Sequence, residues 1–170
     1  MDNIYLIGPM GAGKTTAGAL VAKQKGTDFI DLDQHIKEKT GKTVTEIFDH
    51  YGEEVFRKVE KELFIGLTYR QDTVISTGGG LILDGFCRHL MRMTGHVFYL
   101  SVHLDAQLSR LEHVTDRPLL KQGDRADILK TLYETRKALY EDVADLIIDT
   151  SDSSPEEVAN RILAFIPIED

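Results

Sequence analysis

Short runs of apolar residues alternate along the chain with longer amphipathic stretches. Five of these runs have the length of strands, at residues 4–7, 29–31, 73–77, 97–101 and 146–149. Between them, apolar residues recur three or four positions apart, which predicts helices. Strands that are apolar throughout are typical of a sheet covered on both faces, and their alternation with helices is typical of parallel pairing. The pattern therefore predicts an α/β fold built on a five-stranded parallel sheet.

Two of the predicted helices carry clear start signals. Thr43 and Glu46 have the spacing of a capping box, and Ser154 precedes a proline at the first helical position. The helix that follows the capping box has apolar residues at steps of four, which predicts one buried stripe formed by Val55, Val59, Leu63 and Leu67.

Residues 112–125 differ from the rest of the chain because they are polar and follow no period. They include Pro118 and Gly123, which predicts a loop long enough to move. We interpret residues 32–62 and 112–125 as insertions at the ligand edge of the sheet. No domain boundary is predicted, so residues 1–170 form a single domain.

Composition and charge narrow the possible partners. The chain has 170 residues, of which 42% are hydrophobic and 28% charged, as in ordinary globular proteins. Its formal charge of −8 argues against general binding to nucleic acid or to a membrane surface, so an anionic ligand needs a local cationic site. Cys87 is the only cysteine, which excludes an internal disulfide and suits a reducing cytoplasm. No apolar run approaches the ~20 residues that cross a bilayer.

The segment Gly8–Thr15 fits the phosphate-loop pattern G-x-x-x-x-G-K-[ST] in full, between a predicted strand and a predicted helix. Its glycines allow successive backbone N–H groups to face phosphate oxygens, at the positive end of the helix. Lys14 can reach the outer phosphates, and the Thr15 hydroxyl suits Mg²⁺. The alternative is a glycine-rich turn that binds nothing. The pattern alone does not distinguish an ATPase, a GTPase and a kinase.

Two carboxylates lie at the end of the second predicted strand. Asp31 and Asp33 lie two residues apart, which on an extended segment places both on one face. One can hold magnesium, and the other can accept a hydrogen bond from a substrate hydroxyl. The alternative is a solvated strand end that caps the next helix.

Four arginines are candidates for anion binding, because the planar guanidinium makes bidentate contacts with carboxylate and phosphate. They are Arg57, Arg110, Arg117 and Arg136. Glu60 lies three residues after Arg57 and can hold its guanidinium in place. Composition alone favours the alternative of exposed ion pairs, each worth about 0–1 kcal/mol.

Taken together, these motifs resemble the shikimate kinase family over most of the chain. The matching segments are GPMGAGKTT at 8–16, D-x-D at 31–33, GKTVTEIF at 41–48, Gly52-Glu53, F-R-x-x-E at 56–60, G-G-G at 78–80, D-R-P-L-L at 116–120 and R-x-x-x-Y at 136–140. The glycine loop is common to many kinases, whereas the later segments in this order are specific. The resemblance implies a P-loop NTPase-type three-layer α/β/α fold with strand order 2-3-1-4-5, a substrate-binding lobe at 32–62 and a mobile lid at 112–125.

The resemblance also implies an activity. The γ-phosphoryl group of ATP would move to the 3-hydroxyl of shikimate, giving 3-phosphoshikimate and ADP on the route to aromatic amino acids. The expected enzyme is a cytoplasmic monomer that uses ATP as co-substrate and one Mg²⁺ ion per subunit, without nucleic-acid or membrane partners. The alternatives are another small-metabolite kinase, such as a gluconate or nucleoside-monophosphate kinase, and a nucleotide-binding module without transfer activity. A screen of acceptors with ATP separates them.

Residue roles follow from the same resemblance. The implied catalytic residues are Lys14, Asp33 and Arg117, and the implied magnesium ligands are Thr15 and Asp31. ATP would contact Gly11, Ala12, Gly13, Lys14, Thr15, Thr16, Arg110 and Arg117. Shikimate would contact Asp33, Arg57, Gly79, Gly80 and Arg136, with the two arginines around its carboxylate.

Overall fold

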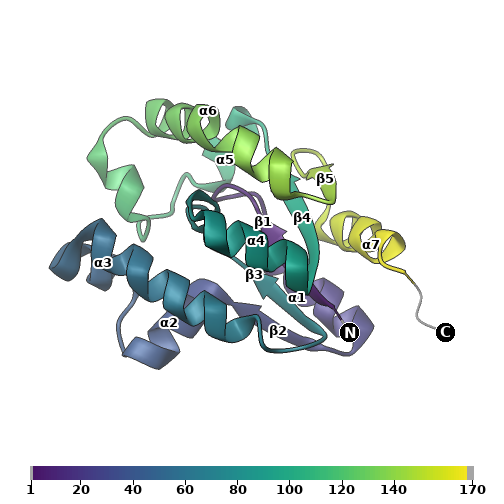
Figure 1. Ribbon diagram of the computed structural model, residues 1–170. Coiled ribbons are helices and arrows are strands. Elements are labelled where there is room, and N and C mark those ends of the chain that lie inside the picture. The colour runs from purple at the N-terminus through teal and green to yellow at the C-terminus, as the bar shows by residue number, and fades with distance from the viewer. Residues whose placement is uncertain (1, 168–170) are drawn as a thin grey trace.

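The computed structural model describes residues 2–167. Its elements are β1 (Asn3–Ile7), α1 (Lys14–Lys25), β2 (Asp28–Asp31), α2 (Leu32–Thr40), α3 (Val44–Leu67), β3 (Thr73–Ser76), the 3₁₀ helix η1 (Leu81–Leu83), α4 (Gly85–Thr94), β4 (Gly95–Ser101), α5 (Leu104–Arg110), the 3₁₀ helix η2 (Pro118–Gln122), α6 (Arg125–Val143), β5 (Leu146–Asp149) and α7 (Pro155–Phe165). The strands form one sheet in the order β2-β3-β1-β4-β5, and every neighbouring pair is parallel. The predicted α/β class and strand order are confirmed (Figure 1).

The central strand β1 is buried on both faces, which explains its unbroken apolar sequence. Ile4 and Leu6 pack in one core cluster with residues of α1 and α7. Tyr5 and Ile7, which point to the opposite face, pack in a second cluster with residues of α2, α3, α4 and α6. The molecule therefore has three layers, with the sheet between two layers of helices (Figure 1).

The helix start signals are confirmed. The Thr43 hydroxyl accepts a hydrogen bond from the Glu46 N–H at 3.1 Å, and the Ser154 hydroxyl accepts one from the Glu157 N–H at 3.1 Å. Each bond satisfies a backbone donor that has no partner inside the first turn of its helix.

The stripe predicted along α3 is confirmed only in part: Leu67 is buried and Val59 and Leu63 pack against the core, but the stripe does not include the most buried positions. Val55 is 42% exposed, and the fully buried positions beyond residue 55 are Phe56, Glu60, Phe64 and Leu67. Gly52 interrupts the helix with φ 85°, so the segment after it takes its own orientation against the sheet. The spacing of apolar residues could not predict this buried face, because Glu60 is one of its members.

Residues 112–125 are more ordered than the sequence suggested. Pro118–Gln122 form the short helix η2, and Leu120 is buried with Leu111 and Leu129 in a small apolar cluster. A 3₁₀ helix of five residues is too short to produce a periodic pattern. The segment extends from the end of α5 towards α3 before it enters α6 (Figure 1).

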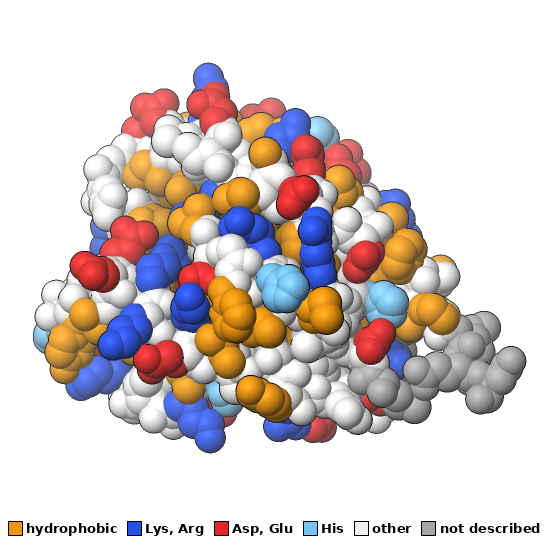
Figure 2. Space-filling view, viewed as in Figure 1, with side chains coloured by type: hydrophobic (Ala, Val, Ile, Leu, Met, Phe, Trp, Pro, Cys, Tyr) orange, Lys and Arg blue, Asp and Glu red, His pale blue; other side chains and the backbone are white. Residues whose placement is uncertain are grey.

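The surface mixes side chains of different kinds. On the face shown in Figure 2, basic, acidic and apolar side chains are interspersed rather than gathered into one continuous patch. Within residues 2–167, no helix has both the length and the apolar character needed to span a bilayer. Cys87 is buried.

Candidate active site

A cleft of about 800 Å³ opens where β1, β2 and β3 end. The carboxyl ends of parallel strands meet at one edge of the sheet, which is where α/β proteins bind ligands. The predicted site residues that line the cleft are Gly11, Gly13, Lys14, Thr15, Thr16, Asp31, Asp33, Arg57, Gly79, Gly80, Arg110, Arg117 and Arg136. Side chains from segments far apart in the sequence thus meet around one space.

Ala12 is the one predicted site residue that does not line the cleft. It is fully buried, and its carbonyl accepts a hydrogen bond from the Thr150 hydroxyl at 2.8 Å. This hydrogen bond connects the glycine loop to the segment after β5. The sequence held no signal for Thr150, because the contact joins residues 138 positions apart.

The glycine loop leads into α1 through Gly13, whose φ of 87° favours glycine. Lys14 Nζ donates to the carbonyl oxygens of Gly8 and Pro9 at 2.7 and 2.8 Å, so the ammonium group lies over the curve of the loop. Burial, and after it the positive charge of Arg117, lowers the pKa of Lys14 to about 8. The loop therefore presents a desolvated cation whose charge depends on pH near neutrality.

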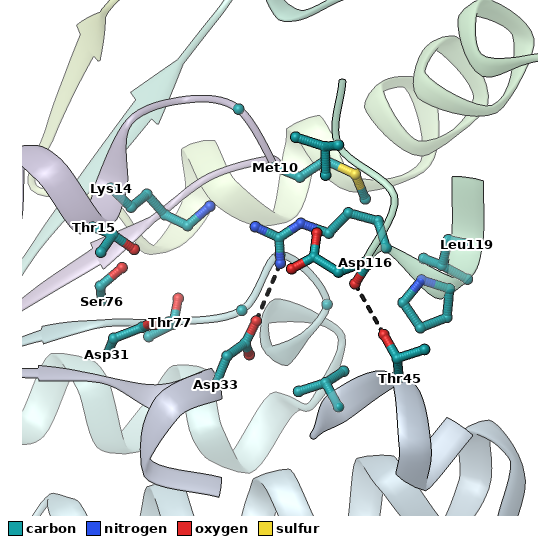
Figure 3. Close-up of a pocket in the computed structure, with 18 of the residues that line it drawn as sticks. Met10, Lys14, Thr15, Asp31, Asp33, Thr45, Ser76, Thr77, Asp116 and Leu119 are labelled. Atoms are coloured by element: carbon teal, nitrogen blue, oxygen red, sulfur yellow. Dashed lines mark hydrogen bonds and ion pairs between the residues drawn. The ribbon is translucent and has the colours of Figure 1, made fainter. Parts of the chain in front are cut away.

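Asp31 and Asp33 both line the cleft, but they do not share one face of a strand as predicted. Asp31 ends β2, but Asp33 lies in the first turn of α2, so the pair is not on one extended segment. Both nevertheless line the cleft, because the helix turns directly at its edge (Figure 3). Burial raises the pKa of Asp31, and the neighbouring charge of Asp33 adds to that effect. Such a carboxylate gains most from a cation placed beside it.

Asp31, Thr15 and Ser76 bring oxygen atoms together at one end of the cleft (Figure 3). Ser76 pairs in register with Asp31 on the neighbouring strand, and its buried hydroxyl has no hydrogen-bond partner in the described part of the chain. Hydroxyl and carboxylate oxygens are hard donors, and Mg²⁺ commonly takes one or two carboxylates and completes its shell with phosphate and water. Residues 2–167 contain no cluster of three His, Cys, Asp or Glu side chains that could cage a metal alone. This donor set fits magnesium held jointly with a nucleotide.

Two contacts connect the segment 112–125 to the opposite side of the cleft. Arg117 Nη1 donates to Asp33 Oδ2 at 3.3 Å, and the Thr45 hydroxyl donates to the Asp116 carbonyl at 3.0 Å (Figure 3). Sequence analysis did not single out Thr45 as a site residue. Its place in the segment 41–48, which carries the family resemblance, is the signal that could have found it.

Arg57 is held by acidic neighbours on α3. Its Nη1 donates to Glu60 Oε1 at 2.9 Å, which confirms the predicted pair, and Glu53 lies at 3.5 Å from Nη2. Glu60 is 1% exposed, and burial raises its pKa to about 7 against the opposing effect of Arg57. A Cβ added to Gly80 would lie 2.3 Å from the guanidinium nitrogens of Arg57, so a side chain at this position would displace the guanidinium.

Arg136 approaches the same glycine segment from α6. It is buried, and its Nη1 would lie 3.6 Å from a Cβ added to Gly79, as would the hydroxyl of Tyr140. Arg57 and Arg136 thus flank the segment Gly78–Gly80 from different helices. Two guanidinium groups therefore lie beside this glycine segment.

Arg110 lies at the far end of the cleft. It donates to the Gly11 carbonyl at 3.0 Å and to the Thr150 hydroxyl at 3.1 Å. It therefore joins the glycine loop to the segment after Asp149. Its contact with ATP stays a prediction.

Comparison with known proteins gives consistent results. The shikimate kinase family model matches residues 10–167. A shikimate kinase of Xylella fastidiosa is 41% identical over 161 residues, which cover 95% of this chain and 89% of that protein. One of Alteromonas mediterranea is 43% identical over 164 residues, which cover 96% of each chain.

The solved structures that resemble this chain also include shikimate kinases. The shikimate kinase from Acinetobacter baumannii in complex with shikimate has a TM-score of 0.93 and 39% identity, covering 96% of this chain and 91% of that one. A gluconokinase from Sinorhizobium meliloti has a TM-score of 0.58 at 19% identity, a likeness of fold alone.

Proposed function

The chain belongs to the shikimate kinase family, and from this premise we propose that it transfers the γ-phosphoryl group of ATP to the 3-hydroxyl of shikimate, giving 3-phosphoshikimate and ADP. One observation carries the proposal. A phosphate loop and two arginines, Arg57 and Arg136, line a single cleft. One side of that cleft suits a triphosphate, and the other suits a small carboxylate.

ATP would lie along the glycine loop. The N–H groups at Gly11, Ala12 and Gly13 and the start of α1 would hold phosphate oxygens, while Lys14 would exchange its loop carbonyls for the outer phosphates. Thr16 and Arg110 would complete the nucleotide contacts from the two ends of the cleft.

Thr15 and Asp31 would hold one Mg²⁺ ion, directly or through water, and the orphan hydroxyl of Ser76 is a further candidate for its hydration shell. When bound, magnesium supplies positive charge to the phosphate oxygens. The role of these residues would be to place hard oxygen donors beside the phosphate loop.

The acceptor would be held by its carboxylate. Arg57 and Arg136 would bind the carboxylate, and the backbone at Gly79 and Gly80 would contact it from between them. This pair explains how a protein with a formal charge of −8 binds an anion. Removing one partner of a desolvated charge pair of this kind costs about 2–5 kcal/mol of binding free energy.

Asp33 would receive the reacting hydroxyl. The hydroxyl oxygen bonds to the γ-phosphorus, the bond from phosphorus to the bridging oxygen breaks, ADP leaves with that electron pair, and the hydroxyl proton passes to Asp33. The transition state is loose, so proton transfer comes late and a weak base suffices. Lys14 and Arg117 would neutralise charge on the equatorial phosphate oxygens.

The segment 112–125 would act as a lid over the substrate-binding lobe at residues 32–62. Water competes with shikimate for the phosphoryl group, so closure protects the reaction while it places Arg117. The contacts of Arg117 with Asp33 and of Thr45 with the Asp116 backbone support this role, because they already connect the lid to the lobe.

ADP release in a coupled assay tests the activity. With ATP and Mg²⁺, shikimate should stimulate ADP release, while gluconate and nucleoside monophosphates should not. Release with one of these controls instead of shikimate would contradict the proposal, and nucleotide binding without any acceptor-dependent release would favour a binding module. We also infer a cytoplasmic monomer, which gel filtration and cell fractionation test.

A further inference from the structure

The backbone carbonyl groups of the glycine loop share one property, since each of them from Gly8 to Gly13 accepts a hydrogen bond. Lys14 Nζ donates to the carbonyls of Gly8 and Pro9, and the Ala17 N–H donates to that of Gly13 at 3.0 Å in the first turn of α1. The three carbonyls between them accept from side chains of other segments, namely Met10 from Gln107 at 2.9 Å, Gly11 from Arg110 at 3.0 Å and Ala12 from Thr150 at 2.8 Å.

Two of these donors differ from the others in position. Lys14 and Arg110 line the cleft, and both would contact ATP in the proposed function. Gln107 and Thr150 are buried and lie outside the lining of the cleft. Their hydrogen bonds therefore reach the loop from behind, and a nucleotide in the cleft does not need to displace them.

Gln107 has the simpler contacts of the two buried donors. It lies on α5 and is 5% exposed, and its amide nitrogen donates to the Met10 carbonyl. A carbonyl oxygen can only accept, so the nitrogen of the side-chain amide must face it. The Thr150 hydroxyl has three partners, so its removal would disturb several contacts at once. Gln107 is thus the position at which one contact of the loop can be removed by itself.

The direction of the Met10 carbonyl matters for an anionic ligand. Met10 and Gly11 both line the cleft, and the peptide that joins them carries an oxygen with partial negative charge. Gln107 holds this oxygen on the side of α5. Gly11 has φ 77° and no side chain, and glycine permits peptide orientations that other residues do not. A carbonyl oxygen turned into the cleft would repel phosphate.

We propose that Gln107 is a positioning residue for the nucleotide phosphates, which holds the Met10 carbonyl away from the phosphate site. The inference rests on the proposed function, because it takes the glycine loop to hold the phosphates of ATP. Without the amide donor, the carbonyl loses its one side-chain partner in the described chain and can turn towards the cleft. The effect is confined to ligands that carry phosphate, since the nucleoside and the acceptor contact other segments.

The test compares ADP with adenosine, which has the same nucleoside and no phosphate, by calorimetric titration. Gln107→Met keeps the length of the side chain and removes the donor, so we expect the Kd for ADP to rise about 10-fold. The Kd values for adenosine and for shikimate should stay within about twofold of the wild type. Ser109→Ala changes an exposed residue of the same helix and should match the wild type with all three ligands.

Equal losses for ADP and adenosine would overturn the inference, because they would show a general loosening of the site. So would an unchanged Kd for ADP, or an equal effect of Ser109→Ala. If Gln107→Met does not fold, a crystal structure of the wild type with ADP decides. The Met10 carbonyl should then stay within hydrogen-bond distance of Gln107 Nε2, and a carbonyl turned towards the phosphates would contradict the inference. If the wild type binds ADP but releases none with shikimate, the proposed transfer fails, whereas the comparison of ADP with adenosine still decides the role of Gln107.

Discussion

Arg117 and Asp33 are 84 residues apart in the sequence, yet the guanidinium of the first donates to the carboxylate of the second at 3.3 Å. One belongs to the proposed lid and the other to the proposed acceptor site. A hydroxyl that approaches Asp33 must therefore share this carboxylate with Arg117 or displace it. In the proposed mechanism, the contact would couple the position of Arg117 to occupancy of the acceptor site.

This coupling predicts how loss of Arg117 affects catalysis. Arg117→Ala should lower kcat by about 100-fold or more, because charge stabilisation is needed in the transition state, and should change the affinity for shikimate much less. Steady-state kinetics and direct binding measure the two effects. Arg161→Ala, an exposed arginine on α7, is the control. Unchanged turnover would refute the role.

The affinity for shikimate should depend on Arg57. Arg57→Ala removes one of two guanidinium groups from the proposed carboxylate site and leaves Glu60 buried without its partner. We expect the KM for shikimate to rise about 30-fold or more while the KM for ATP stays nearly constant. Lys58→Ala changes the exposed neighbour on the same helix and should have little effect. A comparable loss of ATP affinity would show that the assignment is wrong.

The pKa of Lys14, lowered to about 8 by burial and by Arg117, predicts a pH dependence. As pH rises through about 8, the free enzyme loses the ammonium charge that attracts phosphate, so kcat/KM for ATP should fall. In Arg117→Ala the repelling charge is absent, and the alkaline fall should move to higher pH. An unchanged profile between the two proteins would contradict the electrostatic link.

Glu60 predicts a pH dependence of stability. Its pKa is raised from 4.5 to about 7, so between these values the folded protein keeps a proton that the unfolded chain has released. Through this group, the free energy of unfolding falls as pH rises from about 4.5 to about 7. Relative to the wild type, Glu60→Gln should gain about 2 kcal/mol over that interval in urea unfolding. The exposed Glu62→Gln should show no such gain.

The glycine segment predicts a contrast between two neighbouring positions. A methyl group at Gly80 would collide with Arg57 at 2.3 Å, whereas at Gly79 it would meet no atom closer than 3.6 Å. Gly80→Ala should therefore lower the midpoint of thermal unfolding and disturb Arg57, while Gly79→Ala should unfold near the wild-type temperature. Equal midpoints for the two variants would show that Arg57 moves aside without cost.

The features that could be predicted from the sequence are those that depend on interactions between residues close together in the chain. The apolar strands, the caps at Thr43 and Ser154, and the loop Gly8–Thr15 depend on residues close together in the chain, so their patterns predict their structure. The resemblance to a known family then predicted that Arg57, Arg117 and the other candidates belong to one site.

Tertiary structure decided which side chains meet. The buried face of α3 shows the limit, since a helix face is chosen by the surfaces that pack on it, and here that face includes Glu60 and leaves Val55 exposed. The sequence by itself determined the elements and the phosphate loop, because hydrogen bonding and periodicity act over a few residues. Only the fold could bring Tyr140 to Gly79 and Thr45 to Asp116, because such contacts depend on how distant segments pack and have no local signal.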